Sequence, residues 1–216
     1  MAPQAAPKEA APWQSQLPLG LIIAICIVIE VVLSAADLNW GGLGGLRNEV
    51  YRDGAFWPAY LAGQKPIFPA QPWTMFLSYG FLHGGLLHLS LNMITLYSLG
   101  NAVIEYSSTP RFLLIYFASM IGGGLAYGYL AATTMPMVGA SGALFGLGGA
   151  IVTWRWLAQG GFFRAARVVG PMVLMLLLIN VALYYLLGGL LAWETHLGGF
   201  LVGCVIAPFF RKRRPK

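Results

Sequence analysis

The sequence predicts an all-α membrane protein in which six transmembrane helices form one polytopic bundle. Of its 216 residues, 58% are hydrophobic and 9% are charged, whereas about a quarter of the residues of an ordinary soluble domain are charged. Such a chain lacks the polar side chains that a water-facing surface requires. It contains several apolar stretches close to the roughly 20 residues that a helix needs to cross a bilayer. The length leaves little room for a separate soluble domain, so we expect one domain.

The apolar stretches place the expected spans at Leu19–Ala36, Leu86–Glu105, Arg111–Ala131, Ser141–Leu157, Val168–Leu187 and Thr195–Phe210. The expected organisation is a disordered tail at 1–18, the membrane domain at 19–210 and a basic tail at 211–216. The first span is expected to be retained, because its apolar run is longer than a signal-peptide core and only Lys8, offset by Glu9, precedes it.

The one long connection, from Asp37 to about His83, is rich in aromatic, proline and glycine residues, including Trp40, Trp57 and Trp73. Tryptophan and tyrosine are enriched where a membrane meets water. We therefore expect an ordered interfacial structure in this connection rather than a flexible linker.

Basic residues predict the orientation in the membrane. Five of the thirteen lie in the last six positions, directly after an apolar helix, which is typical of a cytoplasmic anchor beside anionic lipid. The sequence contains no stripe of basic residues interleaved with aromatic residues, so it gives no indication of nucleic-acid binding. With the C-terminus in the cytoplasm, six spans place the N-terminus there too, and the external side keeps only Arg47, Arg52 and Lys65. Spans two, four and six then run inward, so His88, Ser141 and His196, each near the start of one of them, lie at a similar depth near the external face.

Ser141 opens the fourth span in Gly139-Ala140-Ser141-Gly142. A serine in this place is often a helix N-cap, and Gly142 with Gly146 forms a pair of small residues suited to close helix packing. The alternative is a nucleophile, because a helix N-terminus offers free N–H groups and a positive dipole end to an oxyanion.

His196 opens the sixth span, and an ionisable residue in a membrane helix is a candidate functional residue. A histidine bonded to a neighbouring helix is the other interpretation. Gly199 and Gly203 share its helical face. If these glycines met the glycines of span four, Ser141 Oγ could reach a ring nitrogen of His196, as a base-activated serine requires.

His88 and Asn92, four residues apart at the start of the second span, could donate hydrogen bonds to an oxyanion or act as polar contacts between helices. The three histidines, His83, His88 and His196, could instead bind zinc. However, His83 and His88 are five apart, and no HExxH-type motif is present. We therefore expect neither a metal nor a cofactor.

Together the three segments resemble the rhomboid family of intramembrane proteases. The resemblance rests on His-x4-His-x3-Asn, Gly-x-Ser-Gly-x3-Gly and His-x2-Gly-x3-Gly, in the family's order, over about Trp73 to Phe210. It implies a dyad of Ser141 and His196 without a third acid, and oxyanion contacts from the Ser141 backbone, His88 and Asn92.

The resemblance also implies supporting roles. His83 matches a position that supports the site structurally. Phe145 matches a position where an aromatic ring packs against the histidine. Gly142, Gly199 and Gly203 allow close packing.

Several acidic and polar positions depart from the family or lack a role. Thr74 stands where the family often has an arginine, and Glu105 follows Gly100 by five positions rather than four. Glu194 precedes His196 by two residues and is not expected to touch its ring. Glu30, inside the first span, is expected to be protonated or paired.

The resemblance therefore implies a serine endopeptidase that cleaves single-span membrane protein substrates near the outer face, with entry between spans two and five. The loop Gly188–Glu194, with its glycine pair, is the expected lid over the site. The alternatives are a non-catalytic relative acting as a membrane chaperone or binding protein, and a metal site or transporter. The absence of an organelle-type presequence favours a multi-pass protein of the bacterial plasma membrane.

Overall fold

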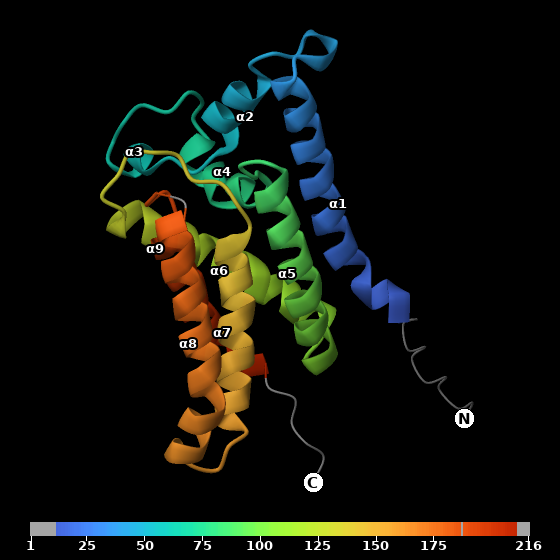
Figure 1. Ribbon diagram of the computed structural model, residues 1–216, viewed down its shortest axis with the longest axis vertical. Helices are drawn as coiled ribbons and strands as arrows, with labels where there is room; N and C mark the ends of the chain where they lie inside the picture. Colours follow the sequence, from blue (N-terminus) through green and yellow to red (C-terminus); the bar gives the residue numbers. More distant parts are fainter. Residues whose placement is uncertain (1–11, 187, 211–216) are drawn as a thin grey trace, which may run out of the picture.

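The computed structural model describes residues 12–186 and 188–210, and this part of the chain folds into α-helices and short 3₁₀ turns (Figure 1). The long helices are α1 (Pro12–Asp37), α5 (Leu86–Tyr106), α6 (Thr109–Leu130), α7 (Ser141–Leu157), α8 (Phe162–Leu186) and α9 (Trp193–Ile206). The shorter elements are η1 (Trp40–Gly42), α2 (Leu46–Gly54), α3 (Pro58–Leu61), α4 (Gln71–Ser78), η2 (Tyr79–Phe81) and η3 (Ala207–Phe210). The predicted all-α membrane fold is confirmed.

Five stretches of the described chain are long and apolar enough to cross a membrane: those in α1, α5, α6 and α8, and α9 together with η3. The remaining predicted span, α7, has 17 residues, or about 25 Å of helix at 1.5 Å per residue. It begins and ends where the sequence predicts. It contacts α5, α6, α8 and α9, and most of its residues are buried, so it lies inside the bundle.

Most other boundaries differ from the prediction by a few residues. Helix α1 begins at Pro12, seven residues earlier than expected, since proline is tolerated in the first turn of a helix. Helix α8 begins at Phe162 and α9 at Trp193. The predicted lid is therefore shortened to 188–192, because Trp193 and Glu194 form the first turn of α9. The predicted basic tail 211–216 lies outside the described residues, as do 1–11.

Glycines bring α7 and α9 unusually close. A Cβ added to Gly199 would overlap the carbonyl of Gly142, and one added to Gly203 would overlap the carbonyl of Gly146. Small residues permit such backbone contact in membrane proteins, where dispersion and weak polar contacts drive helix association. This packing places the start of α9 beside the start of α7.

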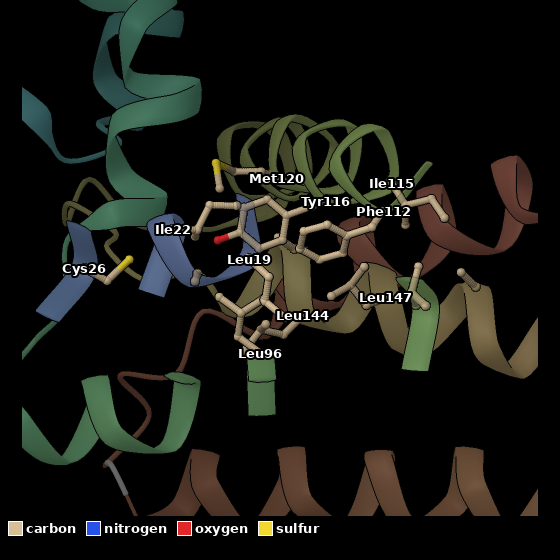
Figure 2. Packing of buried hydrophobic residues seen from close by; sticks show 14 of the residues in the cluster. Leu19, Ile22, Cys26, Leu96, Phe112, Ile115, Tyr116, Met120, Leu144 and Leu147 are labelled. Carbon is tan, nitrogen blue, oxygen red and sulfur yellow. The ribbon is translucent and has the colours of Figure 1, made fainter. Parts of the chain in front are cut away.

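A single hydrophobic cluster joins α1, α5, α6 and α7. Figure 2 shows Leu19 and Ile22 of α1 near Tyr116 of α6, with Leu96 of α5 and Leu144 of α7 close by. Tyr116 and Leu96 are fully buried. The cluster holds the four helices at fixed positions relative to one another, whereas α8 stays at the edge of the bundle.

The long first connection is ordered, as its aromatic content predicts. It contains α2, α3 and α4 at one end of the bundle (Figure 1). Phe56 pairs with Met137 through two backbone hydrogen bonds of 3.0 and 2.9 Å. The connection is therefore attached to the segment that leads into α7.

Arg47 of α2 gives Glu30 a partner. Its guanidinium donates to both carboxylate oxygens of the fully buried Glu30, at 2.8 and 3.1 Å, and to Asp37 at 2.7 Å. The bond to Glu30 is the main cause that raises the pKa of Arg47. Of the two possibilities that the sequence leaves open for Glu30, the structure therefore shows the pairing.

Candidate active site

The site is built from the first turns of α5, α7 and α9, which lie at the end of the bundle that carries α2–α4 (Figure 1). His88 lies in the first turn of α5, Ser141 begins α7, and His196 lies in the first turn of α9. These residues come from distant parts of the chain. The structure places them at the same level, as the alternating topology predicts.

The segment before α7 fixes the position of Ser141. Gly139 donates its N–H to the carbonyl of Tyr79 at 2.9 Å, and Met137 is paired with Phe56. Gly139 has a φ of +129°, a conformation that favours glycine. Tyr79 is itself buried and donates its hydroxyl to the Met120 carbonyl at 2.7 Å. The start of α7 is thus held by both the first connection and α6.

Ser141 and His196 are in hydrogen-bond contact. Ser141 Oγ lies 2.8 Å from Nε2 of His196, which is 6% exposed. Phe145, one turn after Ser141, stacks on the imidazole with ring centroids 4.2 Å apart and an interplanar angle of 8°. The ring is therefore confined in its plane by Phe145 while one of its nitrogens faces the serine.

The other ring nitrogen contacts a residue that the sequence analysis did not single out. Nδ1 of His196 lies 2.6 Å from Oδ1 of Asn180, in α8. The available signal was a lone amide within Leu176-Leu177-Leu178-Ile179-Asn180-Val181, since polar residues in membrane helices commonly have functional partners. Glu194 does not take this position, in agreement with the sequence analysis.

His88 and Asn92 face the residue two positions before Ser141. A Cβ added to Gly139 would lie 2.9 and 3.0 Å from Cε1 and Nε2 of His88, and 3.9 Å from Nδ2 of Asn92. The N–H of Gly84 donates to Nδ1 of His88 at 3.2 Å. Because a backbone N–H can only donate, Nδ1 accepts, and a neutral His88 ring carries its proton on Nε2. Two side-chain donors therefore converge beside the N-terminus of α7.

His83 lies behind His88. The two rings meet edge to face with centroids 5.3 Å apart, and His83 is fully buried. The pKa of His83 is lowered to about 3, mainly by burial of the ring and to a smaller extent by the neighbouring His88. The His83 ring is thus neutral at physiological pH and suited to packing against His88.

The His83 backbone is tied to α2. Its carbonyl accepts hydrogen bonds from Arg47, at 3.1 Å, and from the Tyr51 hydroxyl. Burial raises the pKa of Tyr51, which keeps the phenol in its donating form. Thr74 instead lies within α4, with its hydroxyl 3.5 Å from the Gln71 carbonyl. The connection is thus supported by an arginine that lies at a different position from the one the resemblance points to.

Within the described residues, no three His, Cys, Asp or Glu side chains lie close enough together to hold a metal ion. His83 and His88 are neighbours, whereas His196 is bonded to Ser141 and Asn180. The chemistry that the arrangement can perform is that of an oxygen nucleophile beside an imidazole base, with N–H donors nearby.

Comparison with known proteins points to one family. Residues 69–213 match the family model described as the Rhomboid domain. Over 145 residues, or 67% of the chain, the sequence is 30% identical to "Rhomboid protease GluP" of Bacillus subtilis (strain 168). It is 34% identical over 151 residues, or 66% of the chain, to "RHOMBOID-like protein 2" of Arabidopsis thaliana, and 27% identical over 162 residues, or 69%, to human "Rhomboid-related protein 3". The matched parts are 27%, 44% and 40% of those proteins, so the chain spans less than half the length of each.

Proposed function

Because the chain belongs to the rhomboid family, we propose that it is an intramembrane serine endopeptidase with Ser141 as nucleophile and His196 as general base. The observation that carries the proposal is the 2.8 Å contact between Ser141 Oγ and His196 Nε2 at the N-terminus of α7. A serine hydroxyl is a weak nucleophile, and an adjacent imidazole activates it by accepting its proton.

In the proposed first step, Ser141 Oγ bonds to the carbonyl carbon of a substrate peptide while its proton passes to Nε2 of His196. The carbonyl oxygen becomes an oxyanion. In this proposal the Ser141 N–H, His88 Nε2–H and Asn92 amide donate to it. The proximity of the His88 ring and the Asn92 amide to Gly139, two residues before Ser141, supports this role. Donors placed before the reaction stabilise the developing charge without reorganisation.

In the second step, the imidazolium returns its proton to the leaving amide nitrogen, and the C–N bond breaks. An ester between Ser141 and the new carboxyl end remains. A water molecule, deprotonated by His196, then attacks this ester, and Ser141 recovers its proton. The cycle needs no metal, oxidant or cofactor from outside.

The substrates in this proposal are single-span membrane proteins cleaved near the outer face. The protein is an integral multi-pass membrane protein, and its basic residues favour cytoplasmic termini. Ser141 begins α7 at the end of the bundle that carries α2–α4, where the count of basic residues predicts the external side, so water from that side could reach it. The short loop 188–192 before α9 would act as the lid. Residence in the bacterial plasma membrane stays a prediction from the sequence.

Labelling with a serine-directed fluorophosphonate tests the nucleophile. In detergent or proteoliposomes, the wild type should be labelled on the peptide that contains Ser141 and should cleave a reporter with one transmembrane helix. Ser141→Ala should lose both. Ser90→Ala is the matched control. Ser90 lies one turn into α5, and its hydroxyl donates a hydrogen bond to the Leu86 carbonyl at 2.8 Å rather than to an imidazole. A non-catalytic relative would show neither labelling nor cleavage, and undiminished labelling of Ser141→Ala would refute the assignment.

A further inference from the structure

We propose that Asn180 of α8 is a positioning residue that sets the tautomer of His196 and so makes its Nε2 a base toward Ser141. The inference deepens the proposed function and rests on it. It adds a third side chain to the predicted pair, from a helix that the sequence motifs do not include.

The first step is the orientation of the Asn180 amide. Its Nδ2 donates to the carbonyl of Leu176, one turn earlier in α8, at 3.0 Å. A carbonyl oxygen only accepts, so the NH2 group must face Leu176. The Oδ1 atom therefore faces His196, and the usual ambiguity between amide oxygen and nitrogen is resolved by the helix itself.

The second step is the proton on the imidazole. Oδ1 of Asn180 lies 2.6 Å from Nδ1 of His196, and it can only accept a hydrogen bond. Nδ1 therefore carries the hydrogen. A neutral imidazole has a single N–H, so Nε2 keeps its lone pair and accepts from Ser141 Oγ, 2.8 Å away. The opposite tautomer would direct an N–H at the serine and could not take its proton.

The third step concerns the choice between the two ring nitrogens of His196, which Phe145 does not determine. Stacking at 4.2 Å and 8° confines the plane of the His196 ring, but a flat apolar ring does not distinguish the two nitrogens. Asn180 supplies that distinction. The contact borders a cavity of about 450 Å³ whose other lining residues, such as Val173, Leu177 and Phe200, are mostly apolar. Hydrogen bonds gain strength in such low-dielectric surroundings.

The fourth step concerns α8. Among its described residues, Ala165 and Val169 are the buried ones, and Asn180 lies roughly 16 Å further along the helix than Val169 at 1.5 Å per residue. The Asn180–His196 bond thus joins α8 to α9 in a part of α8 that otherwise has little buried surface. The base is oriented only while Asn180 of α8 stays within hydrogen-bond distance of His196.

The test combines spectroscopy with kinetics on the full-length protein. In protein labelled with ¹⁵N-histidine, the His196 resonances are assigned from their loss in His196→Ala. The wild type should show the Nδ1–H tautomer. Asn180→Leu, which has the same branched shape and no acceptor, should lose this preference, and kcat should fall about 10- to 100-fold with KM nearly unchanged. Asn180→Asp, which retains an acceptor oxygen, should keep the Nδ1–H and most of kcat.

Asn101→Leu is the matched control. The Asn101 amide donates to the Tyr97 carbonyl at 2.8 Å, just as the Asn180 amide donates to the carbonyl one turn earlier in its own membrane helix. Asn101 lies about 22 Å along α5 from the end of the helix at the site, at 1.5 Å per residue. In Asn101→Leu, the tautomer of His196 and the kcat for reporter cleavage should match those of the wild type. Asn180→Leu with unchanged tautomer and kcat within twofold would overturn the inference. If the wild type is neither labelled nor active, the proposed function fails, while the tautomer comparison still decides whether Asn180 orients His196.

Discussion

The carbonyl oxygen of Gly142 in α7 occupies the space where a side chain at Gly199 of α9 would begin. The backbones of the two helices are therefore in direct contact one turn or less from Ser141 and His196. The distance between Ser141 and His196 depends on this contact, and no added atom can be accommodated without moving a helix.

Gly199→Ala should therefore lower both stability and activity. The new methyl would overlap backbone rather than a flexible side chain, and overpacking of this kind costs about 1–3 kcal/mol or more. Thermal unfolding in detergent and reporter cleavage measure the two effects. Gly170→Ala in α8 is the control, because its added Cβ would meet nothing within 4 Å. Equal stability of the two variants would contradict the packing argument.

Arg47→Ala should destabilise the protein strongly. It would remove the cation that pairs with the fully buried Glu30 carboxylate, which would keep only the hydrogen bond from the Ser34 hydroxyl at 3.0 Å, and it would take one donor from the His83 carbonyl. Removing one side of a buried ion pair costs about 3–5 kcal/mol, measured as a lowered apparent Tm. Arg52→Ala is the matched control on the same helix, since Arg52 pairs with Asp53 at the exposed surface. A similar Tm for both variants would show that Arg47 is not structural.

Asn92→Ala should reduce kcat by up to about 10²–10³-fold, with little change in KM, if its amide donates to the oxyanion. Steady-state cleavage of the reporter gives both constants. The comparison variant is Asn101→Ala, further along the same helix, whose amide also bonds to the carbonyl four residues earlier. Should both variants keep wild-type kcat, Asn92 is only a polar contact between helices.

Gly139→Ala should abolish most activity. Its Cβ would stand 2.9–3.0 Å from the His88 ring, so the ring must move away from the Ser141 side. Gly63→Ala carries a similar backbone penalty, with φ of +90° and open space around it, and strain of this type costs about 1–3 kcal/mol. Stability should fall in both, and cleavage only in Gly139→Ala. Loss of cleavage in both would attribute the effect to backbone strain alone.

Sequence reasoning identified most helices of this protein because the bilayer imposes a simple length rule on apolar stretches. The starts of α5 and α7 were predicted to the residue, since Gly85 and the Gly139-Ala140 pair interrupt the pattern there. The start of α8 was placed six residues late at Val168, because Phe162 to Arg167 contains two arginines that dilute the apolar signal. Helix formation there follows from backbone hydrogen bonding and does not require hydrophobicity.

The sequence also predicts the candidate site residues, because alternating spans bring the starts of every second helix to one level. These residues are Ser141, His196, His88 and Asn92. The neighbours of these residues were not accessible. The sequence shows Asn180 as a polar residue in an apolar helix. Because that helix is almost uniformly apolar, its hydropathy does not indicate which face, and so which neighbour, Asn180 points to. The pairing of Arg47 with Glu30 likewise joins segments whose approach depends on how α2 folds back over α1.

The apolar pattern alone thus specifies a membrane bundle and the level at which its polar side chains lie, because bilayer thickness and alternating direction act on any chain of this composition. The rotation of each helix and the pairing of its polar atoms were decided only in the folded bundle. There, glycine contacts between α7 and α9 set the distance from Ser141 to His196, and α8 brings the Asn180 amide within hydrogen-bond distance of the other ring nitrogen.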